Sequence, residues 1–244
     1  GRVSHPSFHK GRLPISSSAT VLKATLGSTG LISGQSREAS LEEISSLVNE
    51  YAVAAKNAIL AGFDGIEIHG ANGYLVDQFL HYCTNQRQDN YGNTPENMSR
   101  FALEIIDACV KEIGKDRVGI RLSPGGHMAG IITENHDKHV FSFLLEQIYQ
   151  RKIAYVHVGN FDDSILYPEL DNQSSTEFIR TNYKGTLITS GGYNIKSAHD
   201  GLLFNKFDLV AFGRPFLANH DLIYKLKNNI PLENYDPKML STLV

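Results

Sequence analysis

Three polar side chains with complementary chemistry occur within the six residues from position 69 to position 74. An apolar, β-branched run ends at His69, and Asn72 and Tyr74 follow in a glycine-containing segment. An imidazole and a carboxamide can donate hydrogen bonds to one oxygen atom, and a nearby phenol can deliver a proton. The segment therefore indicates a site that polarises an oxygen atom. In the alternative, His69 is a satisfied structural histidine and Asn72 only shapes the turn.

Two glycine-containing turns later in the chain form a second candidate site. Ser190-Gly191-Gly192 follows one apolar run, and Phe212-Gly213-Arg214 follows the next. Backbone N–H groups of glycines, together with a guanidinium, can bind an anion, and barrel proteins often bind phosphate in the loops after their last two strands. We expect these three glycines and Arg214 to hold a phosphate-bearing cofactor or substrate. In the alternative, the glycines only close tight turns and Arg214 is a surface charge.

Arg121 lies inside an apolar run, between Ile120 and Leu122. The alternation of side chains along a strand directs Arg121 to the face opposite these two neighbours, into the interior of a barrel. A buried guanidinium requires an anionic or strongly accepting partner, so we expect an electron-rich ligand near Arg121. A structural salt bridge is the alternative.

Metal and disulfide sites are not expected. His127, His136 and His139 have no compact set of carboxylates beside them, so we predict that no metal is bound. Cys83 and Cys109 lack the spacing of a zinc site or a disulfide framework, and we expect both to be reduced packing residues.

The elements that position these residues alternate between strands and helices. Five short apolar runs read as buried parallel strands, at 63–68, 117–122, 153–158, 186–190 and 208–212. Six amphipathic helices are expected at 41–61, 96–113, 137–151, 175–183, 195–204 and 221–228, the first with a capping box of Ser40 and Glu43. Strict alternation indicates either an open doubly wound sheet or a (β/α)₈ barrel. Polar or glycine-rich residues follow every strand, which favours the barrel and its catalytic face.

The number of strands is smaller than a closed barrel requires. Five βα units are visible, and the roughly 40 residues before the first helix cannot hold three more at about 30 residues each. We therefore expect a single barrel domain over 1–244 that is incomplete, with only strands four to eight of the barrel. Residues 3–40 are expected to form a long loop region over the catalytic face.

The composition is that of one large globular domain, and a small molecule is the default partner. The chain has 244 residues, of which 41% are hydrophobic, and its formal net charge is −3. This charge gives no electrostatic footprint for nucleic acid or for an anionic membrane. No run of about 18 apolar residues and no signal peptide pattern occurs, so a cytoplasmic protein is expected.

The sequence resembles the Old Yellow Enzyme family along essentially its whole length. The motifs that carry the resemblance are specific when taken together: Gly1-Arg2-Val3-Ser4-His5-Pro6, Gly62-Phe63-Asp64, His69-Gly70-Ala71-Asn72-Gly73-Tyr74-Leu75, Asp77-Gln78-Phe79-Leu80, Asn85, Arg87, Asp89, Tyr91-Gly92, Glu96-Asn97, Arg100-Phe101, Gly119-Ile120-Arg121-Leu122-Ser123-Pro124, Gly191, Gly213-Arg214 and Asn219. The resemblance implies an ene-reductase in which the incomplete domain binds FMN across the mouth of the barrel. NADPH or NADH would reduce the flavin, and an α,β-unsaturated carbonyl compound, a quinone or a nitro compound would reoxidise it.

The resemblance also implies a role for each candidate residue. His69 and Asn72 would hydrogen-bond the substrate carbonyl oxygen while hydride passes from flavin N5 to the β-carbon, and Tyr74 would protonate the α-carbon. The remaining residues would bind the cofactor, with Arg121 beside flavin N1 and O2, and with Gly191, Gly192, Gly213 and Arg214 around the phosphate.

Two other functional hypotheses remain open at this point. The first is that the chain is an inactive remnant or a subunit of such a barrel, because a barrel that lacks about three strands leaves two unpaired edges. Oligomerisation or a complementing chain would then be needed. The second is a flavin-free barrel that uses the same phosphate site for the isomerisation of a sugar phosphate.

Overall fold

Five parallel strands form one sheet in the computed structural model, which describes residues 1–241. The strands are neighbours in the order in which they occur along the chain: β3 (Ile66–Gly70), β4 (Val118–Leu122), β5 (Tyr155–Val158), β6 (Leu187–Thr189) and β7 (Leu209–Val210). At least one helix connects each strand to the next. This arrangement corresponds to five βα units of the predicted (β/α)₈ barrel.

The helices agree with the predicted ones to within about one residue at each end. The predicted helices are α1 (Leu41–Leu60), α3 (Pro95–Ile113), α4 (Asp137–Arg151), α5 (Ser175–Asn182), α6 (Ile195–Leu203) and α8 (Leu222–Lys227). The capping box of α1 is present, since Ser40 Oγ accepts from Glu43 N at 3.2 Å and Glu43 Oε2 accepts from Ser40 N at 2.9 Å. Two short helices were not predicted, namely α2 (Asp77–Leu80) and α7 (Arg214–Ala218).

The first strand differs from the prediction, because it begins at Ile66 and ends at Gly70 rather than spanning 63–68. Pairing with β4 sets these limits, since Ile66 is opposite Val118 and Gly70 is opposite Leu122. Phe63 is 66% exposed and precedes the paired segment. His69 therefore belongs to the strand itself, and its backbone is fixed by the sheet.

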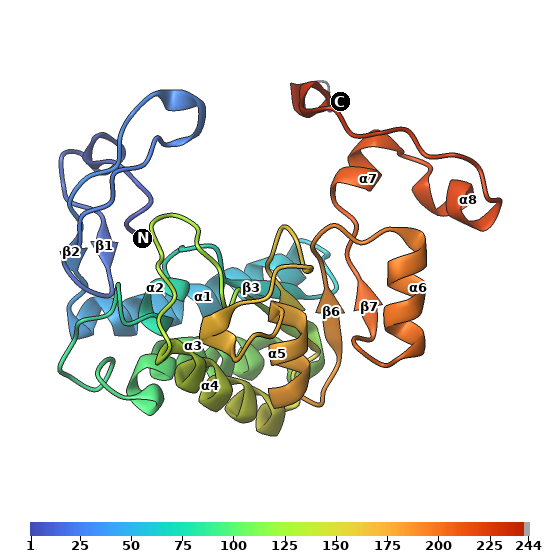
Figure 1. Ribbon diagram of the computed structural model, residues 1–244. Coiled ribbons are helices and arrows are strands. Elements are labelled where there is room, and N and C mark those ends of the chain that lie inside the picture. The colour runs from blue at the N-terminus through green and yellow to red at the C-terminus, as the bar shows by residue number, and fades with distance from the viewer. Residues whose placement is uncertain (242–244) are drawn as a thin grey trace.

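The hydrophobic core lies between one face of the sheet and the helices that cover it. Ile68, Ile120 and Val156 project from neighbouring strands into this core and are at most 2% exposed. Figure 1 shows helices α1, α3, α4 and α5 gathered on this side of the molecule. The rings of Phe79 and Phe101 pack α2 against α3, with 4.4 Å between their centroids. This packing gives the sheet a rigid backing.

The opposite face of the sheet carries polar side chains arranged in rows. The register places His69 opposite Arg121 and Arg121 opposite His157, so that these three residues form one row across β3, β4 and β5. A second row, nearer the start of the strands, contains Glu67, Gly119 and Tyr155. Because alternate residues of a strand point to opposite faces, both rows point away from the core and into the barrel interior.

Gly119 leaves room for a neighbouring aromatic ring. A Cβ atom at this position would collide with the ring of Tyr155 from the adjacent strand. The side chains of Glu67 and His157 also meet across β4, with 2.9 Å between Glu67 Oε2 and His157 Nδ1. The absence of a side chain at position 119 therefore allows residues of β3 and β5 to interact directly.

Residues 1–40 form an arm with little regular structure that precedes α1. It contains two-residue strands β1 (Ile15–Ser16) and β2 (Arg37–Glu38), which pair with each other, and short 3₁₀ turns at Pro6–His9 and Gly27–Thr29. Figure 1 shows the arm in blue rising beside α2. In the same view the C-terminal segment with α7 and α8 lies at the upper right, beyond β7 and away from the arm (Figure 1).

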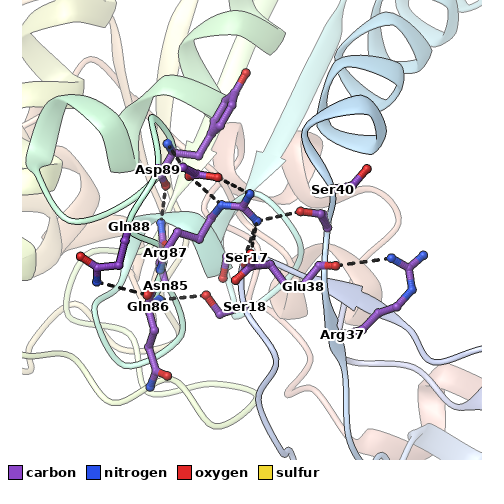
Figure 2. Close-up of polar contacts among 12 residues, drawn as sticks. Ser17, Ser18, Arg37, Glu38, Ser40, Asn85, Gln86, Arg87, Gln88 and Asp89 are labelled. Carbon is purple, nitrogen blue, oxygen red and sulfur yellow. Dashed lines mark hydrogen bonds and ion pairs between the residues drawn. The ribbon is translucent and has the colours of Figure 1, made fainter.

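Arg87 attaches this arm to the rest of the protein. Its buried guanidinium donates to the carbonyl oxygens of Ser17, at 3.0 Å, and Ala39, at 2.8 Å, and forms two hydrogen bonds with Asp89 at 3.0 and 2.6 Å (Figure 2). Ser17 Oγ in turn donates to main-chain oxygens of the α2 region at 2.7 Å. One arginine thus satisfies backbone groups in the middle of the arm and at its C-terminal end.

Both cysteines are free thiols. Cys109 is buried in the core, and burial raises the pKa of its thiol to about 11. Among residues 1–241, no helix combines the length and apolar character that crossing a membrane would require.

Candidate active site

The segment after β3 brings two of the three predicted catalytic side chains together. The rings of His69 and Tyr74 lie 5.2 Å apart between centroids, with an angle of 50° between their planes. Asn72 lies in the turn between them with φ = +60°, and Gly73 follows with φ = +75°. A left-handed conformation is unusual for a residue other than glycine, so this turn must be held by its surroundings.

Hydrogen bonds from its amides to buried side chains fix the backbone of this turn. The amide of Asn72 donates to Ser123 Oγ at 2.9 Å, and the amide of Gly73 donates to Asp77 Oδ2 at 2.8 Å. Position 73 also requires glycine for space, because a Cβ atom there would lie 2.7 Å from the Cβ of Ala129. The turn is therefore tied both to α2 and to the loop that follows β4.

His69 is a neutral imidazole at pH 7. Burial lowers the pKa of His69, and the positive charge of Arg121 on the adjacent strand lowers it further. The negative charges of Asp77 and Glu67 oppose the shift only in part. A neutral ring donates one hydrogen bond without bringing a full charge to its partner.

All five residues predicted to bind a cofactor line one cavity. Its volume is about 760 Å³, which is within the range of small-molecule and cofactor sites. The predicted residues in its wall are Arg121, Gly191, Gly192, Gly213 and Arg214. The cavity thus combines side chains from β4 with the turns after β6 and β7.

Gly191 and Gly213 occupy different environments within this cavity. Gly191 has φ = +116°, and a Cβ atom there would collide with Asn160 Oδ1 and approach Asp163 N to 2.8 Å. Gly213 has an ordinary φ of −93°, and no atom lies within 4 Å of the position that a Cβ atom would take there. Only Gly191 is therefore required by both conformation and space.

Three buried polar atoms in the wall of this cavity have no hydrogen-bond partner among the described residues. They are Arg121 Nε, His157 Nε2 and Asn160 Oδ1. Leaving such a group unpaired in a protein interior costs about 1–3 kcal/mol. A bound molecule with both donors and acceptors would satisfy them. The cavity therefore fits a polar, anion-bearing ligand such as a flavin mononucleotide.

The three predicted catalytic residues lie beside the cavity rather than in its wall. His69, Asn72 and Tyr74 are not among the residues of the cavity wall as defined over residues 1–241. Arg121 connects the two, because it lines the cavity and lies directly opposite His69 in the sheet. A molecule that lies over Arg121 would thus have His69 at its edge.

Two polar residues of this region were not among the predicted site residues. His157 lies in the same row as Arg121, and Asn160 follows two residues after the end of β5. The alternation of Tyr155, Val156 and His157 along β5 is the same signal that identified Arg121. The position of His157 could therefore have been predicted from the sequence.

Glu67 and Tyr155 form a polar pair in the row nearer the start of the strands. Burial would raise the pKa of Glu67, but the hydrogen bond and charge interaction with His157 outweigh this effect and leave the pKa below its ordinary value. Burial, together with the charge of Glu67 and a hydrogen bond to it, raises the pKa of Tyr155 to about 12. Glu67 is thus ionised and Tyr155 is neutral at pH 7.

Within residues 1–241, no group of three or more His, Cys, Asp or Glu side chains is placed to hold a metal ion.

Comparison with known proteins identifies the family. The model of the NADH:flavin oxidoreductase / NADH oxidase family matches residues 12–233, which is most of the chain. The chain belongs to this family. The resemblance to Old Yellow Enzymes and the (β/α)₈ barrel class are confirmed, since an Old Yellow Enzyme homologue from Zymomonas mobilis superimposes with a TM-score of 0.87 at 29% identity.

Other members of the family are similar over nearly the whole chain. The 12-oxophytodienoate reductase 2 of Arabidopsis thaliana is 37% identical over 97% of the chain. The flavin oxidoreductase hxnT of Emericella nidulans is 38% identical over the same share. Morphinone reductase superimposes on 98% of the chain with a TM-score of 0.86 and 35% identity.

All of these family members are longer than the chain. It covers 64% of the Arabidopsis protein, 66% of the Emericella protein and 66% of morphinone reductase. It covers 65% and 63% of two rice relatives.

Proposed function

We propose that the protein is an FMN-dependent ene-reductase, which reduces the C=C bond of α,β-unsaturated carbonyl or related nitro compounds with NADPH or NADH as the reductant. The observation that carries the proposal is the row of His69, Arg121 and His157 across three neighbouring strands. This row joins a candidate oxygen-binding group to the cavity that contains the glycine turns. Family membership and the structure of morphinone reductase in complex with tetrahydroNAD support a flavin and a nicotinamide reductant.

In this proposal the cavity holds FMN, which supplies the hydride when it is bound. Arg121 would contact the electron-rich edge of the flavin ring, where a guanidinium stabilises negative charge. Gly191, Gly192, Gly213 and Arg214 would surround the phosphate, because glycines let backbone N–H groups approach an anion closely. His157 and Asn160 would use their unpartnered atoms to bind the same molecule.

The substrate oxygen would be bound by His69 and Asn72. A neutral His69 donates a hydrogen bond that strengthens as negative charge develops on the oxygen, which stabilises the transition state rather than the ground state. Tyr74, whose ring lies 5.2 Å from that of His69, would hold the proton that completes the reduction. The small-molecule substrate would be an enone, a quinone or a nitro compound.

We also infer that the arm of residues 3–40 belongs to this single domain and flanks the substrate side of the site. Its support is a bridge made by Arg2, whose guanidinium donates to Thr20 Oγ1 of the arm at 3.2 Å and to Ala129 O, in the loop after β4, at 3.0 Å. The sheet edges at β3 and β7 each pair with one neighbour in the described chain, so a second copy or a complementing chain would cover them. Light scattering of the purified protein tests whether another chain covers the edges, and a monodisperse monomer would argue against it.

The visible absorption spectrum of the 244-residue chain, purified and then incubated with FMN, tests the proposed function. A bound flavin band is expected, which bleaches on anaerobic addition of NADPH or NADH and returns on addition of 2-cyclohexenone. A protein that stays colourless after incubation with FMN would overturn the proposal in favour of an inactive remnant. A colourless protein that isomerises a sugar phosphate would identify the flavin-free alternative.

Two variants with equally exposed tyrosines test the proton donor. Tyr74 and Tyr149 are both 46% exposed, but Tyr149 lies on α4 beside Tyr183 and far along the chain from the site. Tyr74→Phe is expected to slow reoxidation by the enone about 10²-fold or more while flavin reduction keeps its rate. Tyr149→Phe is the matched control and should leave both half-reactions unchanged. Equal rates in Tyr74→Phe and Tyr149→Phe would refute the assignment of Tyr74.

A further inference from the structure

A charged cluster lies buried beneath the turn that carries Asn72 and Tyr74. It consists of His81 at the end of α2, Asp77 at its beginning and Asp137 at the beginning of α4. Their side chains are at most 1% exposed. The proposed reaction gives none of them a role. Buried charges of this kind are rare unless they are paired, so the cluster calls for an explanation.

Each ring nitrogen of His81 faces a carboxylate. Nδ1 lies 2.8 Å from Asp137 Oδ2, and Nε2 lies 3.3 Å from Asp77 Oδ1. A neutral imidazole has one N–H donor and one acceptor, so it could satisfy only one ionised partner. If the ring donates to two ionised carboxylates at once, both of its nitrogens must carry protons.

The other contacts of the two aspartates indicate that both are ionised. Asp137 accepts from the amides of Tyr82, at 2.9 Å, and Glu134, at 3.0 Å. Asp77 Oδ2 accepts from the amide of Gly73. Every oxygen of the two carboxylates thus faces an N–H group or a ring nitrogen, and Asp137 also lies in the first turn of α4, where the helix dipole favours negative charge.

The charges around His81 favour its protonated form. The groups that face it are Asp77 from α2, Asp137 from α4 and the uncharged ring of Phe141, also from α4, at 5.2 Å. Burial alone would lower the pKa of His81, but the charges and hydrogen bonds of the two aspartates outweigh it and raise the pKa to about 10. On the other side, burial and the charge of Asp137 raise the pKa of the neighbouring Tyr82, which therefore stays neutral.

The cluster is connected to the catalytic turn through a single carboxylate. Asp77 Oδ2 accepts from Gly73 N at 2.8 Å and faces Ser123 Oγ at 3.4 Å. Ser123 Oγ in turn accepts from Asn72 N at 2.9 Å. The two left-handed residues of the turn are thus both bound, directly or through one hydroxyl, to a carboxylate whose opposite oxygen faces His81.

We propose that His81 is a positioning residue that acts as a buried, doubly protonated imidazolium. It holds Asp77 in the orientation that fixes the backbone of Asn72 and Gly73, and so it places the side chains of Asn72 and Tyr74. What the turn binds rests on the proposed function. The protonation of His81 and the rigidity of the turn do not depend on a flavin. His81 also offsets the charge of Asp77, which acts on His69.

The first experiment observes the wild-type ring directly. Nuclear magnetic resonance of ¹⁵N-histidine-labelled protein reports the protonation of each ring nitrogen, and the signal missing in His81→Gln assigns the residue. Both nitrogens of His81 are expected to carry protons at pH 7.5 and to keep them at pH 9. A singly protonated tautomer at pH 7.5 would overturn the proposal, and this measurement does not require any variant to be functional.

The second experiment compares His81→Gln with His139→Gln, which changes an exposed histidine on α4. In His81→Gln the pKa of His69 is expected to rise, because the charge of Asp77 is no longer offset, and the amides of Asn72 and Gly73 should exchange at least about tenfold faster. His139→Gln should change neither. Adding Asp137→Asn to His81→Gln restores the net charge of the cluster and should return the pKa of His69 toward its wild-type value.

Neither readout requires bound flavin or turnover, so this inference and the ene-reductase proposal can fail separately. Unchanged His69 titration and unchanged amide exchange in a folded His81→Gln protein would show that His81 does not position the turn. If the protein is active, His81→Gln is expected to lower kcat more than it changes KM. The opposite split would contradict a role in positioning groups for the transition state.

Discussion

The glycines of the cofactor cavity allow a graded test of the site geometry by three substitutions to alanine. Gly213→Ala adds a methyl group into open space at an ordinary φ, so it should change stability by less than about 1 kcal/mol, with a small gain expected. Gly192→Ala meets no close atom but has φ = +81°, and a left-handed alanine costs about 1–2 kcal/mol.

Gly191→Ala combines both penalties and should be the most destabilising of the three. The backbone at φ = +116° costs about 1–3 kcal/mol for a residue with a side chain. The collision with Asn160 adds about 1–3 kcal/mol if the neighbouring loop cannot move. The expected loss in the free energy of unfolding is therefore on the order of 2–6 kcal/mol.

Urea denaturation followed by far-ultraviolet circular dichroism measures these differences, since the chain contains no tryptophan for fluorescence. The order expected for stability is Gly213→Ala, then Gly192→Ala, then Gly191→Ala. Affinity for FMN, measured by flavin fluorescence quenching, should be lost first in Gly191→Ala. A Gly191→Ala protein as stable as Gly213→Ala would refute the close approach between Gly191 and Asn160.

Two further predictions concern buried charges. The pKa of His81 is about 10 in the folded protein and about 6.5 in the unfolded chain, so its contribution to stability is fully present below pH 6.5 and is lost as the pH rises through about 10. Urea denaturation between pH 7 and 8.5 should show stability falling by up to about 1.4 kcal/mol per pH unit, and a flat profile would contradict a protonated His81. Arg87→Met should destabilise the protein by about 1–3 kcal/mol for each of the buried carbonyl groups of Ser17 and Ala39 that loses its donor. Limited proteolysis of Arg87→Met should then cut within residues 1–40. The control Arg37→Met removes a partly exposed pair with Glu43 and should lower the free energy of unfolding by less than about 1 kcal/mol. Equal effects of the two substitutions would argue against Arg87 as the anchor.

The sequence predicted the regular elements because each carries a periodic signal. Ser40 and Glu43 mark the start of α1, and β-branched runs mark the strands. The short elements β1, β2, α2 and α7 were missed, since two to five residues are too few to show a period. The beginning of β3 was misplaced because Phe63 is apolar like a strand residue, and only pairing with Val118 reveals where the strand starts.

The candidate site was predictable in part for the same reason. Alternation along β4 indicates the direction of Arg121, and the same rule applies to His157. The cluster of His81, Asp77 and Asp137 could not be predicted, because Asp137 is 56 residues from His81 and meets it only through the packing of α4 against α2. Burial and long-range pairing are properties of the fold, and neither leaves a local pattern in the sequence.

The close contact between Gly119 and Tyr155 has a consequence for how the barrel interior can vary. The two positions share one volume across neighbouring strands, so a side chain at 119 is compatible only with a smaller residue at 155. Such an exchange would also remove the Tyr155 hydroxyl group that hydrogen-bonds Glu67. It would alter the contact between the side chains of Glu67 and His157 across β4. Substitutions at 119 and 155 are therefore expected to covary among related sequences. A protein with only one of the two positions changed should be less stable than a protein with both or neither changed.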